Sequence, residues 1–298
     1  MDQGGMDQGG MDQDGTDRDF MNQGPTNSLR AKEASSQPGA AAIRAAFTRA
    51  RADGRGALMP FITAGYPDLA TTERILAGID EAGVDLVEIG FPFSDPIADG
   101  PVIAESMHHA LIAGATPKQI FELVSRLGVR APLLAMVSVS IVERIGAERF
   151  IAQAVDAGFA GFIVPDADPA DAGRFSALAA SRGAGYCALV SPTTPIDRLS
   201  TLSRVSTGFV YLLARAGVTG ERNEAPEIEA RVQAIRAVSA VPVAAGFGIA
   251  TRAHVEAVSR QADGAIVGSA IVRRMTEAQR AGLDVAATAL SAIRELRA

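Results

Sequence analysis

The sequence predicts an α/β protein, a single closed barrel of eight βα units with a disordered N-terminal extension. Eight apolar, strand-like runs recur along the chain, and segments with the apolar spacing of amphipathic helices separate them. Strands that are apolar throughout and alternate with such helices are typical of a parallel sheet covered by helices. Eight units within about 250 residues fit a closed (β/α)8, or TIM, barrel better than the alternative, an open doubly wound sheet.

The N-terminal segment differs in composition from the rest of the chain. Met1–Gly5 repeats as Met6–Gly10, and Gly, Gln, Asp, Asn and Ser dominate the residues that follow. A segment of this composition buries too little apolar surface to offset the entropy lost on ordering. We therefore expect residues 1–40 to be a disordered low-complexity extension and residues 41–298 to form the catalytic barrel. The segment is acidic and lacks an apolar stretch, so we do not expect a secretory signal peptide.

Order is expected to begin with a helix over Ala41–Ala52, in which Ile43 and Phe47 lie one helical turn apart. Three later helices are expected to end at glycines, because glycine best tolerates the left-handed conformation that commonly follows a helix. The glycines are Gly83, Gly158 and Gly183, and the strand-like runs are Ala57–Ala64, Val84–Phe91, Ala131–Ser138, Phe159–Pro165, Ala184–Ser191, Gly208–Ala214, Val241–Gly246 and Asp263–Ser269.

Two of the eight units are longer than most of the others and are expected to grip the substrate. Extra length in such a barrel usually goes into loops at the catalytic face, where the strands end. The long unit after the second strand contains Asp99. The long unit after the sixth strand contains Arg215–Arg222, a polar segment with two glycines that is typical of a closing lid.

Two carboxylates mark the second strand and the loop after it. Glu88 lies inside an apolar run, where an unpaired charge is costly to bury. The strand breaks at Phe91–Pro96, and Asp99 follows eleven residues after Glu88. Two acids that approach one ligand from two sides are a layout for proton transfer. The spacing alone leaves open a structural pair, with Glu88 as a salt-bridged core acid and Asp99 as a turn former.

Three glycine segments follow the sixth, seventh and eighth strands, at Gly217–Gly220, Gly246–Gly248 and Val267–Ser269. Each segment alone is weak evidence for a binding site, because turns commonly need glycine in any case. Barrels of this class often bind phosphate in the loops after the last two strands, where backbone N–H groups and a helix start face the anion. Three such loops in one sector therefore favour a phosphate site.

Composition narrows the classes of partner. A net charge of −6 provides no basic surface for nucleic acid, and no apolar run reaches the roughly 18–20 residues of a membrane-spanning helix. The single cysteine, Cys187, excludes an intrachain disulfide and suits the cytoplasm. The histidines at 108, 109 and 254 show no metal-ligand spacing, so we expect no bound metal.

A specific family resemblance emerges at the second strand. Glu88–Pro101 reads Glu-Ile-Gly-Phe-Pro-Phe-Ser-Asp-Pro-Ile-Ala-Asp-Gly-Pro and resembles the signature of the tryptophan synthase α chain family. The resemblance extends over residues 41–298, with shorter motifs in the same order. These motifs are Pro60–Gly65, Val164–Asp166, Tyr211–Leu213, Arg215–Gly220, Gly246–Ile249 and Gly268–Val272.

The resemblance implies a lyase that cleaves indole-3-glycerol phosphate to indole and glyceraldehyde 3-phosphate without a metal or cofactor. It implies that Glu88 is the general acid–base that protonates the indole ring carbon. Asp99 would hold the indole N–H and stabilise the positive charge that develops there, and Tyr211 completes the catalytic set. Because Glu88 is partly desolvated, we expect its pKa to be raised toward neutrality, whereas Asp99 on its loop stays ionised.

The resemblance also implies a set of substrate contacts. They comprise side chains around the indole ring, backbone groups on the phosphate and one residue of the closing loop beside Asp99. The ring contacts are Phe61, Met136, Ile163, Tyr211 and Phe247, the phosphate contacts are Gly220, Gly248, Gly268 and Ser269, and the loop residue is Thr219.

Family members pair with a β chain that uses pyridoxal phosphate to join indole to serine, so the resemblance implies an α2β2 tetramer with that cofactor only in the partner. Pro92, Asp95 and Pro96, part of the family's partner surface, are retained. Met136–Val142 departs from the usual Tyr-x-Asn-Pro-type segment and lacks an aromatic ring and an amide that commonly contact the partner.

Three alternative functions follow from the same residues. The first is a stand-alone lyase that releases free indole, and the second is a catalytically silent barrel that activates a β chain. The third is another phosphate-binding barrel, such as a sugar-phosphate epimerase. The retained acid pair argues against the silent barrel. Epimerases of this kind tend to use a metal or a second carboxylate on an opposite strand, and the sequence shows no paired motif for that.

Overall fold

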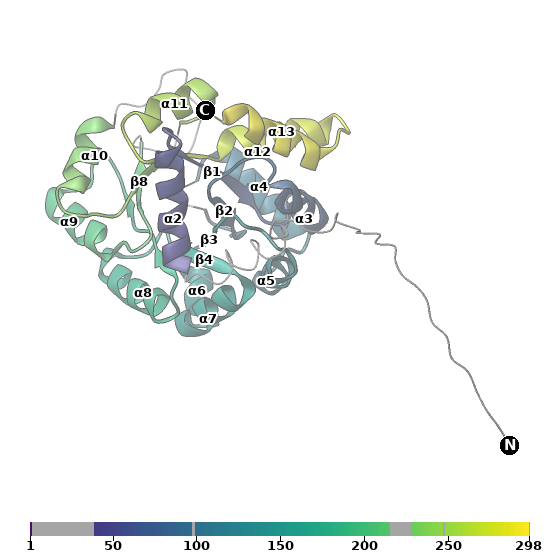
Figure 1. Cartoon of the computed structure of the whole chain (residues 1–298), viewed down its shortest axis with the longest axis horizontal. Coiled ribbons are helices and arrows are strands. Elements are labelled where there is room, and N and C mark those ends of the chain that lie inside the picture. Colours follow the sequence, from purple (N-terminus) through teal and green to yellow (C-terminus); the bar gives the residue numbers. More distant parts are fainter. Residues whose placement is uncertain (2–38, 97–98, 215–227, 247, 298) are drawn as a thin grey trace.

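The computed structural model describes Met1 and residues 39–96, 99–214, 228–246 and 248–297. Within these ranges, strands curl into a barrel and helices form a ring around them (Figure 1). The strands are β1 Ala57–Thr63, β2 Val87–Gly90, β3 Leu133–Met136, β4 Phe159–Ile163, β5 Gly185–Tyr186, β6 Leu189–Val190, β7 Val210–Leu213, β8 Val243–Gly246 and β9 Gly264–Val267. The helices are α2 Gly39–Ala52, α3 Leu69–Gly78, α4 Pro101–Ile112, α5 Pro117–Arg126, α6 Val139–Ile145, α7 Ala147–Ala157, α8 Pro169–Ser181, α9 Ile196–Val205, α10 Glu229–Arg236, α11 Arg252–Ser259, α12 Ser269–Arg280 and α13 Val285–Leu296.

The sheet is parallel, and its two ends meet in one segment of the chain. The hydrogen-bonded order runs β5-β4-β3-β2-β1-β9-β8-β7-β6. Both terminal strands come from the expected fifth strand, which is interrupted at Cys187 and Ala188. Cys187 donates its N–H to the carbonyl of Phe162 on β4 (2.9 Å), and the carbonyl of Ala188 accepts from Tyr211 N–H on β7 (3.0 Å). The closed (β/α)8 barrel is therefore confirmed, with its fifth strand split in two.

All three predicted glycines adopt left-handed conformations, and Gly158 and Gly183 follow the ends of α7 and α8 as the sequence predicts. Gly83, Gly158 and Gly183 have φ values of 77°, 112° and 72°, in the region that favours glycine. The helix α3 is shorter than expected. It ends at Gly78, and turns lead from there to Gly83.

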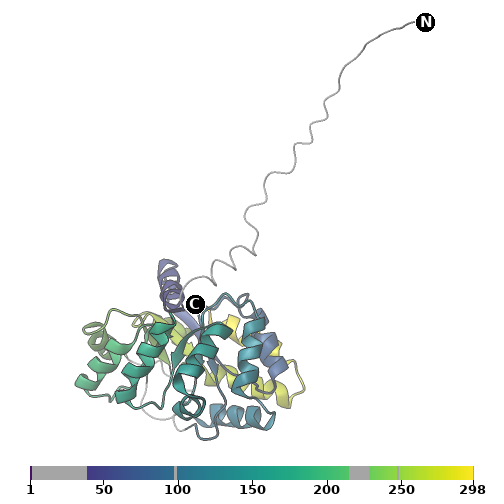
Figure 2. The same cartoon turned by 90° about the horizontal axis from the view of Figure 1, so that it is seen from below.

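The helix α2 closes the end of the barrel at which the strands begin (Figures 1 and 2). It starts at Gly39, two residues before the expected start, and Ala40 donates its N–H to the carbonyl of Gly183. Its fully buried Ile43 fits against glycines of the barrel wall, since a Cβ at Gly161 or Gly185 would lie 2.8 Å from Ile43 Cδ1. Small residues in the wall therefore make room for the closing helix.

The predicted disordered extension falls almost entirely on residues 2–38, which lie outside the described residues, so it stays a prediction. Among the helices that are described, none has both the length and the apolar character needed to cross a bilayer.

The fit of Ile43 into the barrel wall gives a testable stability prediction. Gly185→Ala should destabilise the protein by about 1–3 kcal/mol, because the new Cβ overpacks against Ile43 Cδ1. Adding Ile43→Val removes that methyl group, so the double variant should lose less stability than the two single variants together. Chemical denaturation of the four proteins measures this coupling.

A matched control is Gly173→Ala in α8, where a Cβ meets no atom within 4 Å. It should stabilise the protein by about 0.5–1 kcal/mol, because alanine favours helix. Strict additivity of the Gly185 and Ile43 changes would contradict the proposed fit.

Candidate functional site

Glu88 is a fully buried acid without a counter-charge in the described part of the chain. It lies on β2 with 0% exposure, and neither carboxylate oxygen has a hydrogen-bond partner among the described residues. Burial raises the pKa of Glu88 well above its usual value, and the nearby charge of Asp99 raises it further. The direction of this shift agrees with the expectation from the sequence. Among the described residues, no cation forms a salt bridge with Glu88, which argues against a structural role for it in an ion pair.

Strand register places the expected ring contacts on the same face of the barrel wall as Glu88. Glu88 pairs with Phe61 on β1 and with Leu134 on β3, and residues paired across parallel strands point to the same side. Met136, two residues after Leu134, shares that face and pairs with Ile163 on β4. The sequence-predicted residues on the four neighbouring strands β1 to β4 are thus brought together.

Tyr211 joins this face through the strands on the other side of β1. It pairs with Ala244, Ala244 with Gly264, and Gly264 with Ala57 on the Phe61 face of β1. Burial raises the pKa of Tyr211 well above its ordinary value, and the charges of Glu88 and Asp99 add to the rise. Tyr211 therefore stays a neutral phenol.

Two glycines make room for the aromatic rings of the inner face. A Cβ at Gly90 would lie 2.3 Å from Phe61 Cζ, and one at Gly246 would lie 2.5 Å from the Tyr211 hydroxyl. These positions end β2 and β8, so each ring folds over the carboxyl end of a strand. The aromatic walls depend on glycine there.

Asp99 lies in the loop between β2 and α4, next to the first turn of the helix. Its N–H donates to the carbonyl of Pro96 (3.1 Å), and α4 begins two residues later at Pro101. The helix docks on the barrel through the buried hydroxyls of Thr63 and Ser106, whose oxygens are 2.7 Å apart. The position of Asp99 is therefore tied to β1 as well as to β2.

The acidity of Asp99 differs from the expectation. Burial, with a smaller contribution from the charge of Asp166, raises the pKa of Asp99 to about 6. The carboxyl is still mainly ionised at neutral pH, as expected, but it is much closer to its titration point than an ordinary aspartate.

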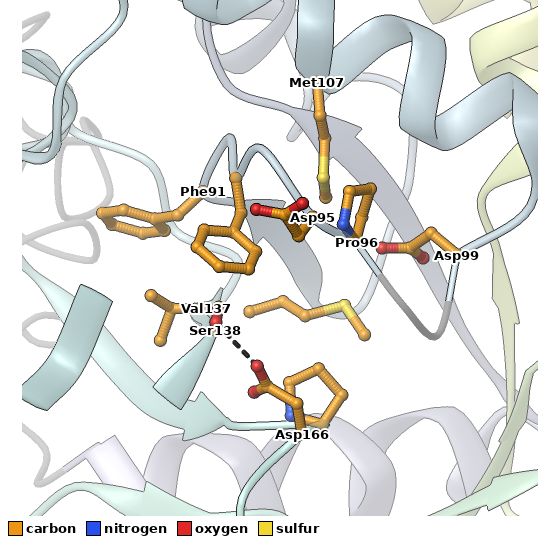
Figure 3. Close-up of a pocket in the computed structure, with 11 residues that line it drawn as sticks. Phe91, Asp95, Pro96, Asp99, Met107, Val137, Ser138 and Asp166 are labelled. Carbon is orange, nitrogen blue, oxygen red and sulfur yellow. Dashed lines mark hydrogen bonds between the residues drawn. The ribbon is translucent and has the colours of Figure 1, made fainter. Parts of the chain in front are cut away.

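Asp99 lines a pocket at the carboxyl ends of β2, β3 and β4 (Figure 3). Among the described residues of the predicted site, Met136 is the only other one in its lining. Glu88 lies one layer deeper, because Met136 pairs with Gly90, two residues beyond Glu88. The lining is mainly apolar, with three carboxylates, and consists of Phe91, Phe93, Asp95, Pro96, Asp99, Met107, Met136, Val137, Ser138, Pro165 and Asp166.

Ser138 and Asp166 form a contact that sequence reasoning missed. Ser138 Oγ donates to Asp166 Oδ2 (2.6 Å), and the Val139 N–H donates to Asp166 Oδ1 (2.8 Å). The only sequence signal is that Asp166 belongs to one of the family-like motifs and that Ser138 lies in the segment that departs from the family.

The expected phosphate contacts are described in part. Gly248 follows β8 with a φ of 78°, and Gly268 follows β9 and caps α12, which starts at Ser269. Because β8 and β9 are neighbours, these glycines lie in adjacent loops. A Cβ at Gly268 would lie 3.4 Å from Phe61 Cβ, so this sector borders the aromatic wall. The remaining expected contacts, Thr219, Gly220 and Phe247, lie outside the described residues.

The arrangement combines a buried acid with a strongly raised pKa, a second acid that is mainly ionised at neutral pH, an apolar pocket and a helix start suited to an anion. Within the ranges that the structure describes, no three His, Cys, Asp or Glu side chains are grouped closely enough to hold a metal ion.

Comparisons with known proteins agree on one family. A family model described as tryptophan synthase alpha chain matches residues 47–297. A tryptophan synthase alpha chain from Synechococcus sp. (strain CC9902) is 44% identical over 248 residues, covering 82% of this chain and 91% of the relative. One from Rhodopirellula baltica is 41% identical over 242 residues, covering 79% and 87%.

Solved structures give the same result. A chain of tryptophan synthase from M. tuberculosis, in an aminoacrylate-bound form, superposes with a TM-score of 0.75 and 30% identity, covering 86% of this chain and 99% of that chain. A mutant tryptophan synthase alpha-subunit from Pyrococcus furiosus superposes with a TM-score of 0.73 and 33% identity, covering 81% and 98%.

The buried state of Glu88 makes a prediction about stability and pH. Below the ordinary value of 4.5 the folded and unfolded chains both carry the proton on Glu88. As the pH rises above it, only the unfolded chain releases that proton, so wild-type stability falls by up to about 1.4 kcal/mol per pH unit until the folded pKa is passed. Glu88→Gln has no such proton. Its stability relative to wild type, measured by urea denaturation, should therefore rise with pH, and a pH-independent difference would contradict the assignment.

Proposed function

The chain belongs to the tryptophan synthase α chain family, and we propose that Glu88 and Asp99 catalyse its lyase reaction. The reaction cleaves indole-3-glycerol phosphate to indole and glyceraldehyde 3-phosphate. The observation that supports this assignment is Glu88 itself, a fully buried acid whose two oxygens have no partner in the described part of the chain. Strongly perturbed acids of this kind are enriched at catalytic sites.

Glu88 begins the reaction as a neutral acid. It donates its proton to the indole carbon that carries the glycerol chain, which places a positive charge on the ring. The resulting carboxylate then accepts the proton of the hydroxyl on the adjacent chain carbon. That hydroxyl becomes the aldehyde carbonyl as the carbon–carbon bond breaks, and the bonding electrons neutralise the ring. Glu88 is protonated again at the end, so one raised pKa serves both steps.

Asp99 acts as the ionised partner. With a pKa of about 6 it carries a negative charge at neutral pH and accepts a hydrogen bond from the indole N–H. Protonation of the ring carbon makes this nitrogen more positive, so the hydrogen bond strengthens in the transition state. An interaction that strengthens in this way lowers the barrier, instead of only binding the substrate.

The inner face and the glycine loops hold the two ends of the substrate in this proposal. Phe61, Met136, Ile163 and Tyr211 enclose the ring, and Tyr211 stays neutral throughout. The phosphate binds at the backbone of Gly248, Gly268 and Ser269, at the start of α12. Roles for Thr219, Gly220 and Phe247 stay predictions from the family resemblance.

Family membership implies a β-chain partner. We assign its contact to the loop after β2, through Pro92, Asp95 and Pro96, in an α2β2 tetramer in which pyridoxal phosphate belongs to the β chain. A cytoplasmic location is consistent with this biosynthetic reaction. The departure at Met136–Val142 favours an alternative in which coupling to the β chain is weak and the chain releases free indole. Indole release measured with and without a β chain separates this alternative from the coupled enzyme.

Glu88→Gln and Asp99→Asn should each lower the rate of indole release by about 10²- to 10⁴-fold, because each removes a group that acts on the transition state. Product indole in single-turnover and steady-state assays measures the rate. Asp95→Asn is the matched control, because Asp95 lines the same pocket from the same loop and should keep near-normal turnover in the isolated chain. Undiminished turnover by Glu88→Gln would exclude Glu88 as the acid.

A further inference from the structure

Asp166 is an exposed side chain whose two carboxylate oxygens are both engaged by a neighbouring loop. It follows β4, and it accepts hydrogen bonds from Ser138 Oγ at 2.6 Å and from the Val139 N–H at 2.8 Å. Ser138 and Val139 belong to the preceding βα unit, 28 and 27 residues earlier in the chain. Figure 3 shows the Ser138 bond at the edge of the pocket.

These bonds fix the start of α6. Ser138 caps that helix and accepts from the Ser140 N–H (3.2 Å), while Asp166 accepts the N–H of the first helical residue, Val139. The Val137 N–H donates to the carbonyl of Ile163 on β4 (3.0 Å). Consecutive residues 137–139 are thus each bonded toward the β4 unit.

The segment fixed in this way is a wall of the pocket. Met136, Val137 and Ser138 line it together with Asp99 and Asp166. In Figure 3, Val137 and Ser138 lie on the other side of the pocket from Asp99. A loosened start of α6 would therefore move the surface against which the indole ring packs.

We propose that Asp166 is a positioning residue, which holds the segment Met136–Ser138 in place as the wall of the substrate pocket. The proposal rests on the proposed function, because it takes this pocket to receive the indole ring. It goes beyond it by giving a role to Asp166 and to the serine that stands where this chain departs from its family. The charge of Asp166 also lies near enough to raise the pKa of Asp99, which is consistent with a place inside the site.

Asp168 shows what an ordinary capping aspartate does in this loop. It lies two residues further on, caps its own helix α8 through the Ala170 N–H (2.8 Å), and is absent from the pocket lining. Its removal should cost helix stability alone. Asp168→Ala is therefore a control matched in residue type, exposure and loop.

An asparagine at position 166 separates hydrogen bonding from charge. The amide oxygen accepts from Val139 N–H, and the amide N–H donates to Ser138 Oγ, so Asp166→Asn keeps both bonds without the negative charge. Asp166→Ala loses both bonds, and Ser138→Ala loses one. If Asp166 is a positioning residue, the rise in KM should be smallest for Asp166→Asn, larger for Ser138→Ala and largest for Asp166→Ala.

The experiment measures kcat and KM for indole release by the isolated full-length chain. Asp166→Ala should raise KM about tenfold while kcat changes less than about threefold, because the wall contacts the ring in the ground state and the transition state alike. Asp166→Asn and Asp168→Ala should stay within about twofold of wild type in both constants. Amide hydrogen exchange over 136–142 should accelerate in Asp166→Ala and not in Asp166→Asn.

Two outcomes would overturn the proposal. If Asp166→Ala has the same KM as Asp168→Ala, Asp166 is only a helix cap. If Asp166→Asn raises KM as much as Asp166→Ala does, the negative charge of Asp166 matters and its hydrogen bonds do not.

A failure of the proposed function is recognised separately. Wild-type protein would then release no indole, with or without a β chain. The chain contains no tryptophan, so binding of indole is followed directly by the fluorescence of the ligand. In that case, faster exchange over 136–142 together with weaker indole binding in Asp166→Ala supports the positioning role, and unchanged exchange or unchanged binding refutes it.

Discussion

The burial of Glu88, whose carboxyl group has no partner among the described residues, is the constraint on which the rest of the site depends. A carboxylate in an apolar interior is strongly disfavoured, so the group stays protonated at a pH at which exposed glutamates are ionised. The closed ring of parallel strands can hold it there because the cost of burying an acid falls on a single residue. A neutral acid that can also act as a base is what the cleavage of indole-3-glycerol phosphate requires.

Acids at the opposite end of the barrel show why the missing partner matters. Asp85 and Asp263 stand at the starts of strands, with side chains 7% and 9% exposed, and each pairs with arginine. Arg55 bonds Asp85 at 2.5 Å, and Arg236 bonds Asp263 at 3.2 Å. These pairs stabilise the face at which the strands begin. Glu88, only three residues after Asp85, has no such cation among the described residues, and this difference supports the catalytic role that we propose for it.

The elements that depend on local sequence could be predicted. The apolar runs predict all eight strand positions, and Gly158 predicts the end of α7, because both signals reside in adjacent residues. The break of the fifth strand at Cys187 was missed, since that run is as apolar as an unbroken strand. The position of Glu88 in a buried strand followed from its apolar neighbours.

What the sequence could not supply are contacts between separate loops. The bond between Ser138 and Asp166 joins residues 28 apart, and no periodicity couples them. The sequence does not predict the pKa of Asp99 for the same reason, because burial in the folded protein and the charge of Asp166 raise it to about 6. Neither effect is visible until the fold brings these groups to one pocket.

The protonation state of Glu88 tests the account most directly. Infrared difference spectra of wild type and Glu88→Gln, with carbon-13 in the glutamate side-chain carboxyls only, isolate Glu88 from Asp99. The account predicts a labelled protonated carboxyl at pH 7 in the wild type that Glu88→Gln lacks. A wild-type spectrum in which every glutamate is ionised at pH 7 would contradict it, because Glu88 would then have no proton to deliver to the indole ring.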